Sequence, residues 1–340
     1  DLTRGAIYWH FKNKDELFIS LWQELCSPLA HQLDACLNPD EPDPLGQLRL
    51  FFEGVLHSFI HNPAQRQMFT ILFNLESLEG EAISLREHIR SEMYEGLAGE
   101  HAPYNLKFVT NGVSCTTVSI ITAALGIRDL GSIDAEQLAL IQKVHLLLVM
   151  YNAMQPGVVA LSGWDLVGAL PLPAEAVAER MLDGDTRWIH RGGYDLAGLD
   201  PQAAASVRGM PRARSLYGSL DSQLDEGDSF ACQVKKLLAV RQAYGIATSR
   251  QVLVPEVRSP GLLVMVHELP AGRGIQITAL NFGQEAIAEE LLLTGFTPGP
   301  VVDMINETVE GDLTEDGRLM VNLDPYEALC LRIVNSSGHV

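Results

Sequence analysis

The chain has 340 residues, which exceeds the size at which a single hydrophobic core stops growing, so we expect two or more domains. Hydrophobic residues make up 47% and charged residues 20% of the sequence, proportions typical of a globular protein and not of a disordered one. The net charge of −19 argues against nucleic acid or an anionic membrane as the partner of the whole molecule.

The five cysteines are scattered, and no two of them have the CxxC spacing of a zinc site. A disulfide framework is not expected in a chain this long and rich in core residues, so the sequence predicts reduced thiols and a cytoplasmic location. Neither a metal nor a cofactor is expected, because Asp183 and Asp185 lack the spacing of a metal loop. The most apolar run, residues 144–154, is too short to span a bilayer and predicts a buried helix instead. The chain starts without Met or a signal peptide, which favours a fragment.

Residues 1–84 have the pattern of an all-helical region. After an opening helix and a turn at residues 12–14, leucines at steps of four predict an amphipathic helix from Asp15 to about Leu37. Prolines at residues 38–44 end that helix. Two further helices are predicted, at about 45–60 and 64–78.

Residues 85–248 have a mixed pattern. Helices are predicted over 85–100, 134–151 and 229–244. The apolar run QPGVVALSGWD (155–165) predicts a buried parallel strand. Residues 171–227 are rich in Gly, Pro, Asp and Arg, and we expect this long irregular segment to cover another element or to line a cleft.

From residue 251 onward the pattern is that of β-structure. Seven short apolar runs alternate with Gly, Pro and Asp turns, which predicts an antiparallel sandwich. His145 and His267 lie in apolar runs, and the simplest interpretation is that both are core or strand histidines.

The opening stretch TRGAIYWHFKNKDELF (3–18) is basic and aromatic in an acidic chain. Thr3 can cap a helix and Gly5 allows a close approach to a surface, while the polar side chains that follow can donate to phosphates. The stretch resembles the recognition helix and following turn of TetR-family transcriptional repressors. The resemblance implies base-edge contacts by Thr3, Arg4 and Gly5, and phosphate contacts by Tyr8, Trp9, His10, Lys12 and Lys14. The family's supporting helices would precede Asp1. A cationic, aromatic helix on a protein surface is the alternative.

A second resemblance starts near Leu85 and extends to the end of the chain. It is carried by the segments LREHIRSEMYEGLAGEHAPYNLKFVTNGVSCTT, YNAMQPGVVALSGWDLVGALPL, DGDTRWIHRGGYDLAGL, RARSLYGSL and LLVMVHELPAG. These segments resemble bacterial trehalose synthases, the maltose–trehalose glucosyl-shifting enzymes of the α-amylase superfamily. The resemblance implies the end of a β/α barrel over 85–248 and an accessory sandwich over 249–340. With a TetR-like helical region over 1–84, the expected fold class is multidomain α+β.

Members of that superfamily retain configuration with a carboxylate nucleophile and a carboxylic acid/base, aided by a third carboxylate. The resemblance implies that all three would lie upstream of the matched region. We therefore predict no catalytic residue here, because Asp34 and the NKDEL segment (13–17) both belong to the repressor-like part. Side chains that could contact a maltose- or trehalose-type sugar, if the remaining barrel is supplied, are Trp164, Asp165, Arg187, Arg191 and Arg214. Simple packing and loop ion pairs are the alternatives for these residues.

Three hypotheses about function follow from these patterns. The chain is the tail of a trehalose synthase-like enzyme joined near residues 80–85 to a TetR-like part, and inactive alone because the carboxylates are missing. Alternatively, it is a DNA-binding regulator. The third hypothesis is a chimera without function, from a rearranged gene or an assembly error.

Overall fold

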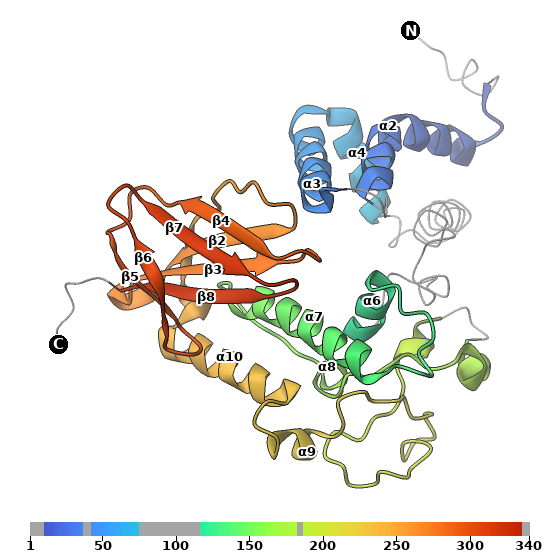
Figure 1. Ribbon diagram of the computed structural model, residues 1–340. Coiled ribbons are helices and arrows are strands. Elements are labelled where there is room, and N and C mark those ends of the chain that lie inside the picture. Colours follow the sequence, from blue (N-terminus) through green and yellow to red (C-terminus); the bar gives the residue numbers. More distant parts are fainter. Residues whose placement is uncertain (1–9, 37–41, 75–115, 182–185, 335–340) are drawn as a thin grey trace. The chain divides into compact units, whose positions relative to one another are not determined.

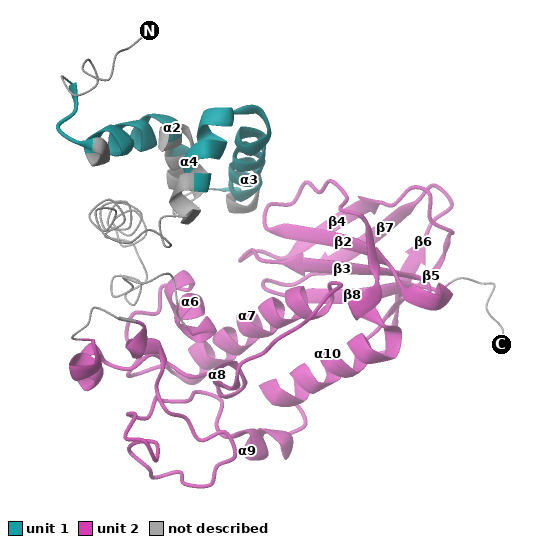
Figure 2. Cartoon of the chain, turned by 180° about the vertical axis from the view of Figure 1, so that it is seen from behind, with its two compact units in different colours: residues 1–99 teal, residues 100–340 magenta. Residues whose placement is uncertain are grey.

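The computed structural model describes residues 10–36, 42–74, 116–181 and 186–334. It divides the chain into two units, residues 1–99 and residues 100–340 (Figure 2). The boundary that we predict near residue 84 lies outside the described residues, as does the helix predicted over 85–100.

The first unit contains three described helices, α2 (Lys14–Cys36), α3 (Pro44–His61) and α4 (Pro63–Asn74). Side-chain caps fix their starts: Asn13 accepts from the Glu16 amide at 2.8 Å, and Asp43 accepts from the Gly46 amide at 2.9 Å. Asn62 ends α3 and its side chain accepts from the first amides of α4. The three helices predicted after the turn at residues 12–14 are thereby confirmed.

In the second unit, α7 (Ala135–Ala153) and α10 (Phe230–Tyr244) pack side by side and confirm two predicted helices (Figure 1). A capping box between Asp134 and Gln137 starts α7, and Gly245, with a φ of +66°, ends α10. Shorter helical segments complete this part: α6 (Thr117–Ala124), α8 (Gly163–Val167), η3 (Ala174–Arg180), η4 (Thr186–His190), α9 (Leu220–Leu224) and η5 (Ile246–Thr248).

The prediction of a buried strand over residues 155–165 is wrong. Residues 155–162 are irregular, and residues 163–167 form the short helix α8, which Ser162 and Gly168 cap at its two ends. An apolar segment becomes a buried strand only when neighbouring strands accept its backbone hydrogen bonds. The described residues 116–181 and 186–248 contain isolated bridges but no strand that could pair with it.

Arg241 on α10 fixes this irregular segment. Its guanidinium group donates to the carbonyl oxygens of Ala153, Gln155 and Gly157, while its side chain is almost fully buried. The carbonyl group of Ala153, the last residue of α7, thereby gains a partner that the helix cannot supply, and the other two carbonyl groups belong to the irregular segment itself.

The C-terminal part forms the predicted antiparallel sandwich. A six-stranded sheet has the order β1-β2-β3-β8-β5-β6, and β4 pairs with β7 in a second, two-stranded sheet. The strands are β1 (Arg250–Leu253), β2 (Leu262–Glu268), β3 (Ile275–Asn281), β4 (Ile287–Leu292), β5 (Gly299–Asp303), β6 (Val309–Leu313), β7 (Arg318–Leu323) and β8 (Ala328–Ile333). The short 3-10 turn η6 (Pro270–Gly272) separates β2 from β3. The strand β6 was not predicted, because as an exposed edge strand it has no apolar run.

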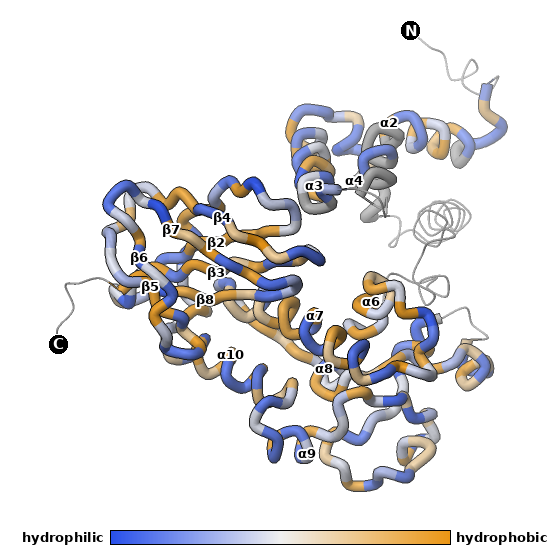
Figure 3. Tube along the Cα trace, viewed as in Figure 1, coloured by the Kyte–Doolittle hydropathy of each residue, from blue (hydrophilic) through white to orange (hydrophobic). Residues whose placement is uncertain are grey.

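The six-stranded sheet has apolar residues on both faces. One face packs on β4 and β7, and the other contacts α7 through Leu147, Met265 and Leu280. Figure 3 shows the corresponding hydrophobic residues along α7 and through the strands. His267 is fully buried in β2, and His145 is buried on α7, so both interpretations as strand or core histidines are confirmed.

Candidate functional site

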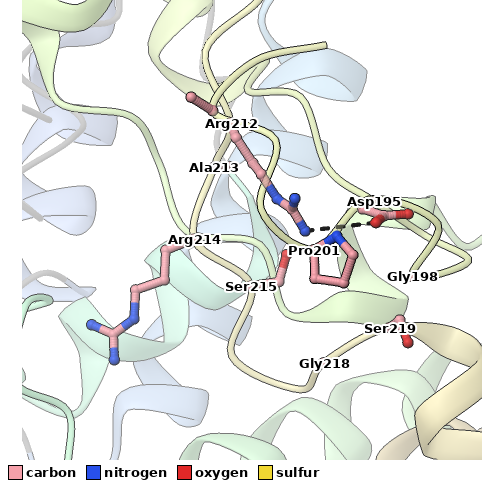
Figure 4. Close-up of a pocket in the computed structure, with 10 residues that line it drawn as sticks. Asp195, Gly198, Pro201, Arg212, Ala213, Arg214, Ser215, Gly218 and Ser219 are labelled. Atoms are coloured by element: carbon pink, nitrogen blue, oxygen red, sulfur yellow. Dashed lines mark ion pairs between the residues drawn. The ribbon is translucent and has the colours of Figure 1, made fainter.

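A cleft with a volume of about 540 Å³ lies in the irregular segment between η4 and α9, where the sequence predicts a cover or a cleft lining. Figure 4 shows its lining. Both walls come from one stretch of chain, and the lining residues are Asp195, Gly198, Pro201, Ala204, Arg212, Ala213, Arg214, Ser215, Gly218 and Ser219.

Asp195 and Arg212 form the charged centre of the cleft. The Asp195 carboxylate accepts from the Leu199 amide at 3.0 Å and from the Asp200 amide at 2.8 Å. These backbone hydrogen bonds, above all the one from Asp200, hold the pKa of Asp195 below its usual value, and the Arg212 guanidinium adds to the effect. Arg212 Nη2 lies 3.9 Å from Asp195 Oδ2. The aspartate is therefore ionised at neutral pH and already paired.

Arg212 also closes the loop that forms one wall. Its Nη1 donates to the carbonyl oxygen of Asp200 at 2.6 Å and to that of Ala203 at 3.3 Å. Arg214 fixes the opposite side, because its Nη1 donates to the carbonyl oxygens of Leu130 at 2.7 Å and Gly131 at 2.9 Å. In Figure 4 the Arg214 guanidinium points away from the pair formed by Asp195 and Arg212.

A buried cluster of Tyr217, His145 and Phe230 anchors the loop. In sequence Tyr217 lies between the lining residues Ser215 and Gly218, and its hydroxyl oxygen is 2.9 Å from His145 Nδ1. Burial lowers the pKa of His145 to about 4, although the Asp165 carboxylate, 3.9 Å from His145 Nε2, acts in the opposite direction. His145 is therefore neutral at pH 7. Its ring also packs in a tilted arrangement against the ring of Phe230, with 4.6 Å between the centroids.

Four of the five predicted sugar contacts lie outside the lining of the cleft. Asp165 turns inward, where it accepts from Ser162 and faces His145. Trp164 donates through Nε1 to the Gly192 carbonyl at 3.3 Å and makes an edge contact with Tyr194.

The remaining three predicted sugar contacts are arginines. Arg187 and Arg191 lie at η4, where Arg191 stacks over Trp188 at 5.1 Å. Of the five, Arg214 alone lines the cleft. Sequence reasoning did not single out Asp195, Ser215 or Ser219, although Asp195 shortly before a glycine turn is a local signal for a loop-capping carboxylate.

Of the predicted DNA contacts, Thr3, Arg4, Gly5, Tyr8 and Trp9 lie outside the described residues. His10 and Lys12 are exposed just before α2, and Lys14 is the first residue of that helix. Within the described ranges, no three His, Cys, Asp or Glu side chains converge as metal ligands would. None of the helices in those ranges has both the length and the apolar character needed to cross a membrane.

Comparison with known proteins confirms the resemblance of the N-terminal part to TetR-family regulators. The chain is 32% identical over 94 residues to the transcriptional regulator TtgR of Pseudomonas putida, a match that covers 28% of this chain and 45% of TtgR. It is 35% identical over 91 residues to AcrR of Shigella flexneri, covering 26% of this chain and 42% of AcrR. The chain thus spans less than half the length of the curated relatives that it matches. No family model matches the sequence.

Among solved structures, the C-terminal part is similar to the trehalulose synthase MutB of Pseudomonas mesoacidophila, with a TM-score of 0.43 and 13% identity over 67% of this chain and 48% of MutB. It is also similar to AmyP in its complex with maltose, with a TM-score of 0.41 and 15% identity over 63% of this chain and 38% of AmyP. The resemblance to trehalose synthases in particular stays a prediction from the sequence.

Proposed function

We propose that the chain joins part of a helix-turn-helix regulator to the C-terminal part of a trehalose synthase-like enzyme, and that the second part binds a small sugar without converting it. The proposed parts are residues 1–84, 85–248 and 249–340, joined near residues 80–85. The observation that carries the proposal is the composition of the cleft, which combines hydrogen-bonding groups with a single carboxylate that is already paired.

The cleft suits a sugar better than an ion or an apolar ligand. Ser215 supplies a hydroxyl group, and Pro201 and Ala204 supply apolar surface for the face of a sugar ring. The Ser219 hydroxyl already caps α9 and donates to Ser222, so it can only accept a further hydrogen bond. The positive charge of Arg212 is balanced by Asp195 and by the carbonyl groups that it contacts, so an anion gains little there.

The same cleft lacks the groups for glycosyl transfer. A retaining enzyme needs two carboxyl groups about 5–5.5 Å apart, one as nucleophile and one as acid and base. Among the described residues that line the cleft, Asp195 is the one carboxylate, and three partners already engage it. Asp165 cannot serve as the second, because its carboxylate faces the buried His145.

The test measures binding and turnover separately. We expect maltose or trehalose to bind weakly, seen by saturation-transfer NMR, and we expect chromatography to detect no conversion of either sugar. Ala204→Phe fills the cleft and should abolish binding, whereas the adjacent Ala205→Phe should not, because Ala205 is exposed and outside the lining. Binding that survives Ala204→Phe would refute the assignment of the cleft. Conversion of maltose by this chain would refute the inactivity.

A second candidate function is regulation through DNA, and the 32–38% identity to transcriptional regulators favours it. In this proposal His10, Lys12 and Lys14 contact phosphates while Thr3, Arg4 and Gly5 reach bases. The probe is a pool of random-sequence duplexes from which binders are selected. Binding should weaken steeply with salt, and Lys12→Ala should reduce the salt slope by about one. The chain's net charge of −19 opposes this binding.

The proposal of a joined gene has its own test. Contiguous sequencing of the locus through the codons for residues 70–95 should show one unbroken reading frame. A break there would favour an assembly error, and the chain would then have no function as a whole.

A further inference from the structure

The C-terminal end of α3 carries a pair of exposed histidines. His57 and His61 stand at the two ends of the segment HSFIH, so three residues separate them on the helix. A step of four residues advances about 40° around a helix, and both side chains therefore project from the same face, one turn apart. Their ring centroids lie 4.4 Å from each other, with an angle of 43° between the ring planes, and both residues are exposed. The helix thus brings two imidazole rings together at its surface.

We propose that His57 and His61 together bind one divalent transition-metal ion, of the zinc, nickel and copper class, with water in the remaining coordination positions. Imidazole is the commonest metal ligand in proteins and suits these three metals. The proposal is independent of the sugar and DNA functions proposed above, because it uses only the described residues of α3. It departs from the expectation of a chain without a metal, which rests on the spacing of cysteines and aspartates and does not consider histidines on a helix.

The spacing and the ring separation match such a chelate. Two histidines four residues apart on a helix are the arrangement with which zinc proteases hold their metal. A zinc ion lies about 2.0–2.1 Å from each ligating nitrogen, hence about 3.2 Å from the ring centroid, and two ligands at about 90–110° place the centroids about 4.5–5.2 Å apart. The observed 4.4 Å is just below that range. Small rotations of two exposed side chains can therefore direct one nitrogen of each ring at a common ion.

The surroundings limit the site to two protein ligands. Glu53 lies one turn before His57 on the same face, but its carboxylate already pairs with Arg49 at 2.8 Å. Among the described residues, no group of three His, Cys, Asp or Glu side chains is arranged to hold a metal. Structural zinc sites use four protein ligands, so we expect a site with two ligands to bind its ion more weakly than a structural site does.

The electrostatics of this position favour a cation. The pair occupies the C-terminal end of α3, where the carbonyl groups without a partner in the helix give it a partial negative charge. Arg66 already uses this property, because its Nη1 donates to the Phe59 carbonyl at 3.2 Å. The net charge of −19 also raises the concentration of cations around the chain. A metal ion is therefore attracted to this end of the helix without a carboxylate among its ligands.

A titration of the full chain with ZnCl2 tests the site. In NMR spectra of the imidazole rings, the signals of His57 and His61 should shift together along one binding curve. His57→Ala and His61→Ala should each raise the dissociation constant measured at the remaining ring by about tenfold or more, because the second ligand no longer binds intramolecularly. His31→Ala is the matched control, because His31 is an exposed histidine on α2 of the same unit, and its substitution should leave the affinity unchanged.

The helical spacing has its own test. Glu53→His in the His61→Ala background recreates the pair one turn earlier, at residues 53 and 57, and should restore most of the lost affinity. All of the substituted positions are exposed, and helical circular dichroism verifies that each variant folds. Zinc should also slow hydrogen exchange of the Asn62 amide, which donates to the Ser58 carbonyl at 2.9 Å, in the wild-type chain but not in His61→Ala.

Three results would overturn the proposal. The first is that the ring signals of His57 and His61 do not respond to ZnCl2. The second is that either alanine variant binds zinc as tightly as the wild-type chain, which would place the ion elsewhere in the chain. The third is that Glu53→His fails to restore binding in the His61→Ala background, which would mean that the spacing of histidines on α3 does not determine the affinity.

Discussion

His190 provides the sharpest test of how the second unit is held together. It ends η4, is 4% exposed, and neither of its ring nitrogens has a hydrogen-bond partner among the described residues. Burial alone lowers the pKa of His190 from 6.5 to about 4. The unfolded chain therefore binds one more proton than the folded chain between pH 6.5 and about pH 4, so stability falls as the pH decreases through that window and is constant below it.

The magnitude follows from these two pKa values. Each pKa unit corresponds to about 1.36 kcal/mol, so the full loss from His190 is about 3 kcal/mol, of which about 2 kcal/mol has occurred at pH 5. His145, whose pKa is also about 4, adds a similar loss. The substitution His190→Leu removes the contribution of His190 and leaves that of His145. The decrease in the free energy of unfolding between pH 7 and pH 5 should therefore shrink by about 2 kcal/mol.

Hydrogen exchange of the Leu172 amide, which donates to the Ile189 carbonyl at 2.7 Å, reports the stability of this region. His190→Leu should also gain about 1 kcal/mol at pH 7, because an unpaired buried polar ring is removed. The control His190→Gln removes the titrating group but keeps buried polar atoms. Its stability should therefore also depend less on pH, but it should not increase at pH 7. If both variants lose as much stability between pH 7 and pH 5 as the wild-type chain does, the reasoning is refuted.

Three further substitutions test the scaffold. Arg241→Met should destabilise the second unit by about 2–4 kcal/mol in urea unfolding, because three carbonyl groups lose a charged donor. Glu289→Gln should cost about 1–2 kcal/mol. Burial raises the pKa of Glu289, but the hydrogen bonds that it accepts from Ser259 and from the Arg258 backbone amide outweigh that effect and keep the carboxylate ionised. The neutral side chain of glutamine would accept these hydrogen bonds less well than the carboxylate. Gly168→Ala should lower the melting temperature more than Gly126→Ala; both glycines have positive φ, but only at Gly168 would a Cβ approach the Tyr217 ring to 2.8 Å.

Helix ends were the most predictable features because their signals are local. Asp43, Asn62 and Ser229 each precede a helix and cap it with their own side chain, and the prolines of residues 38–44 exclude a continuous helix. Strand alternation was equally informative for β7, where every second residue is buried. In these elements the residues that decide the structure are the residues of the element itself.

The segment 155–165 shows the limit of that reasoning. Its apolar run fits a buried strand, but a strand also needs neighbouring strands for its backbone hydrogen bonds. The described residues 116–181 and 186–248 contain no such strand, and Arg241 donates to the carbonyl groups of the segment instead. The contact between Asp195 and Arg212 was missed for a similar reason, since the two residues meet only when the loop between them closes. Trp164 and Asp165 were predicted from an expected strand end, and the short helix α8 directs Asp165 toward His145.

The irregular parts of the second unit share one physical solution, the bonding of a guanidinium group to several backbone carbonyl groups. Arg241 fixes the segment after α7, Arg212 closes the loop at residues 200–203, and Arg214 ties the cleft to residues 130–131. A planar guanidinium can donate to two or three acceptors at once, which a lysine ammonium matches poorly in a fixed geometry. Because these acceptors are main-chain atoms, no sequence pattern identifies them. The shape of the cleft therefore depends on arginines that need not touch a ligand, so Arg214→Lys should alter the cleft although it preserves every charge.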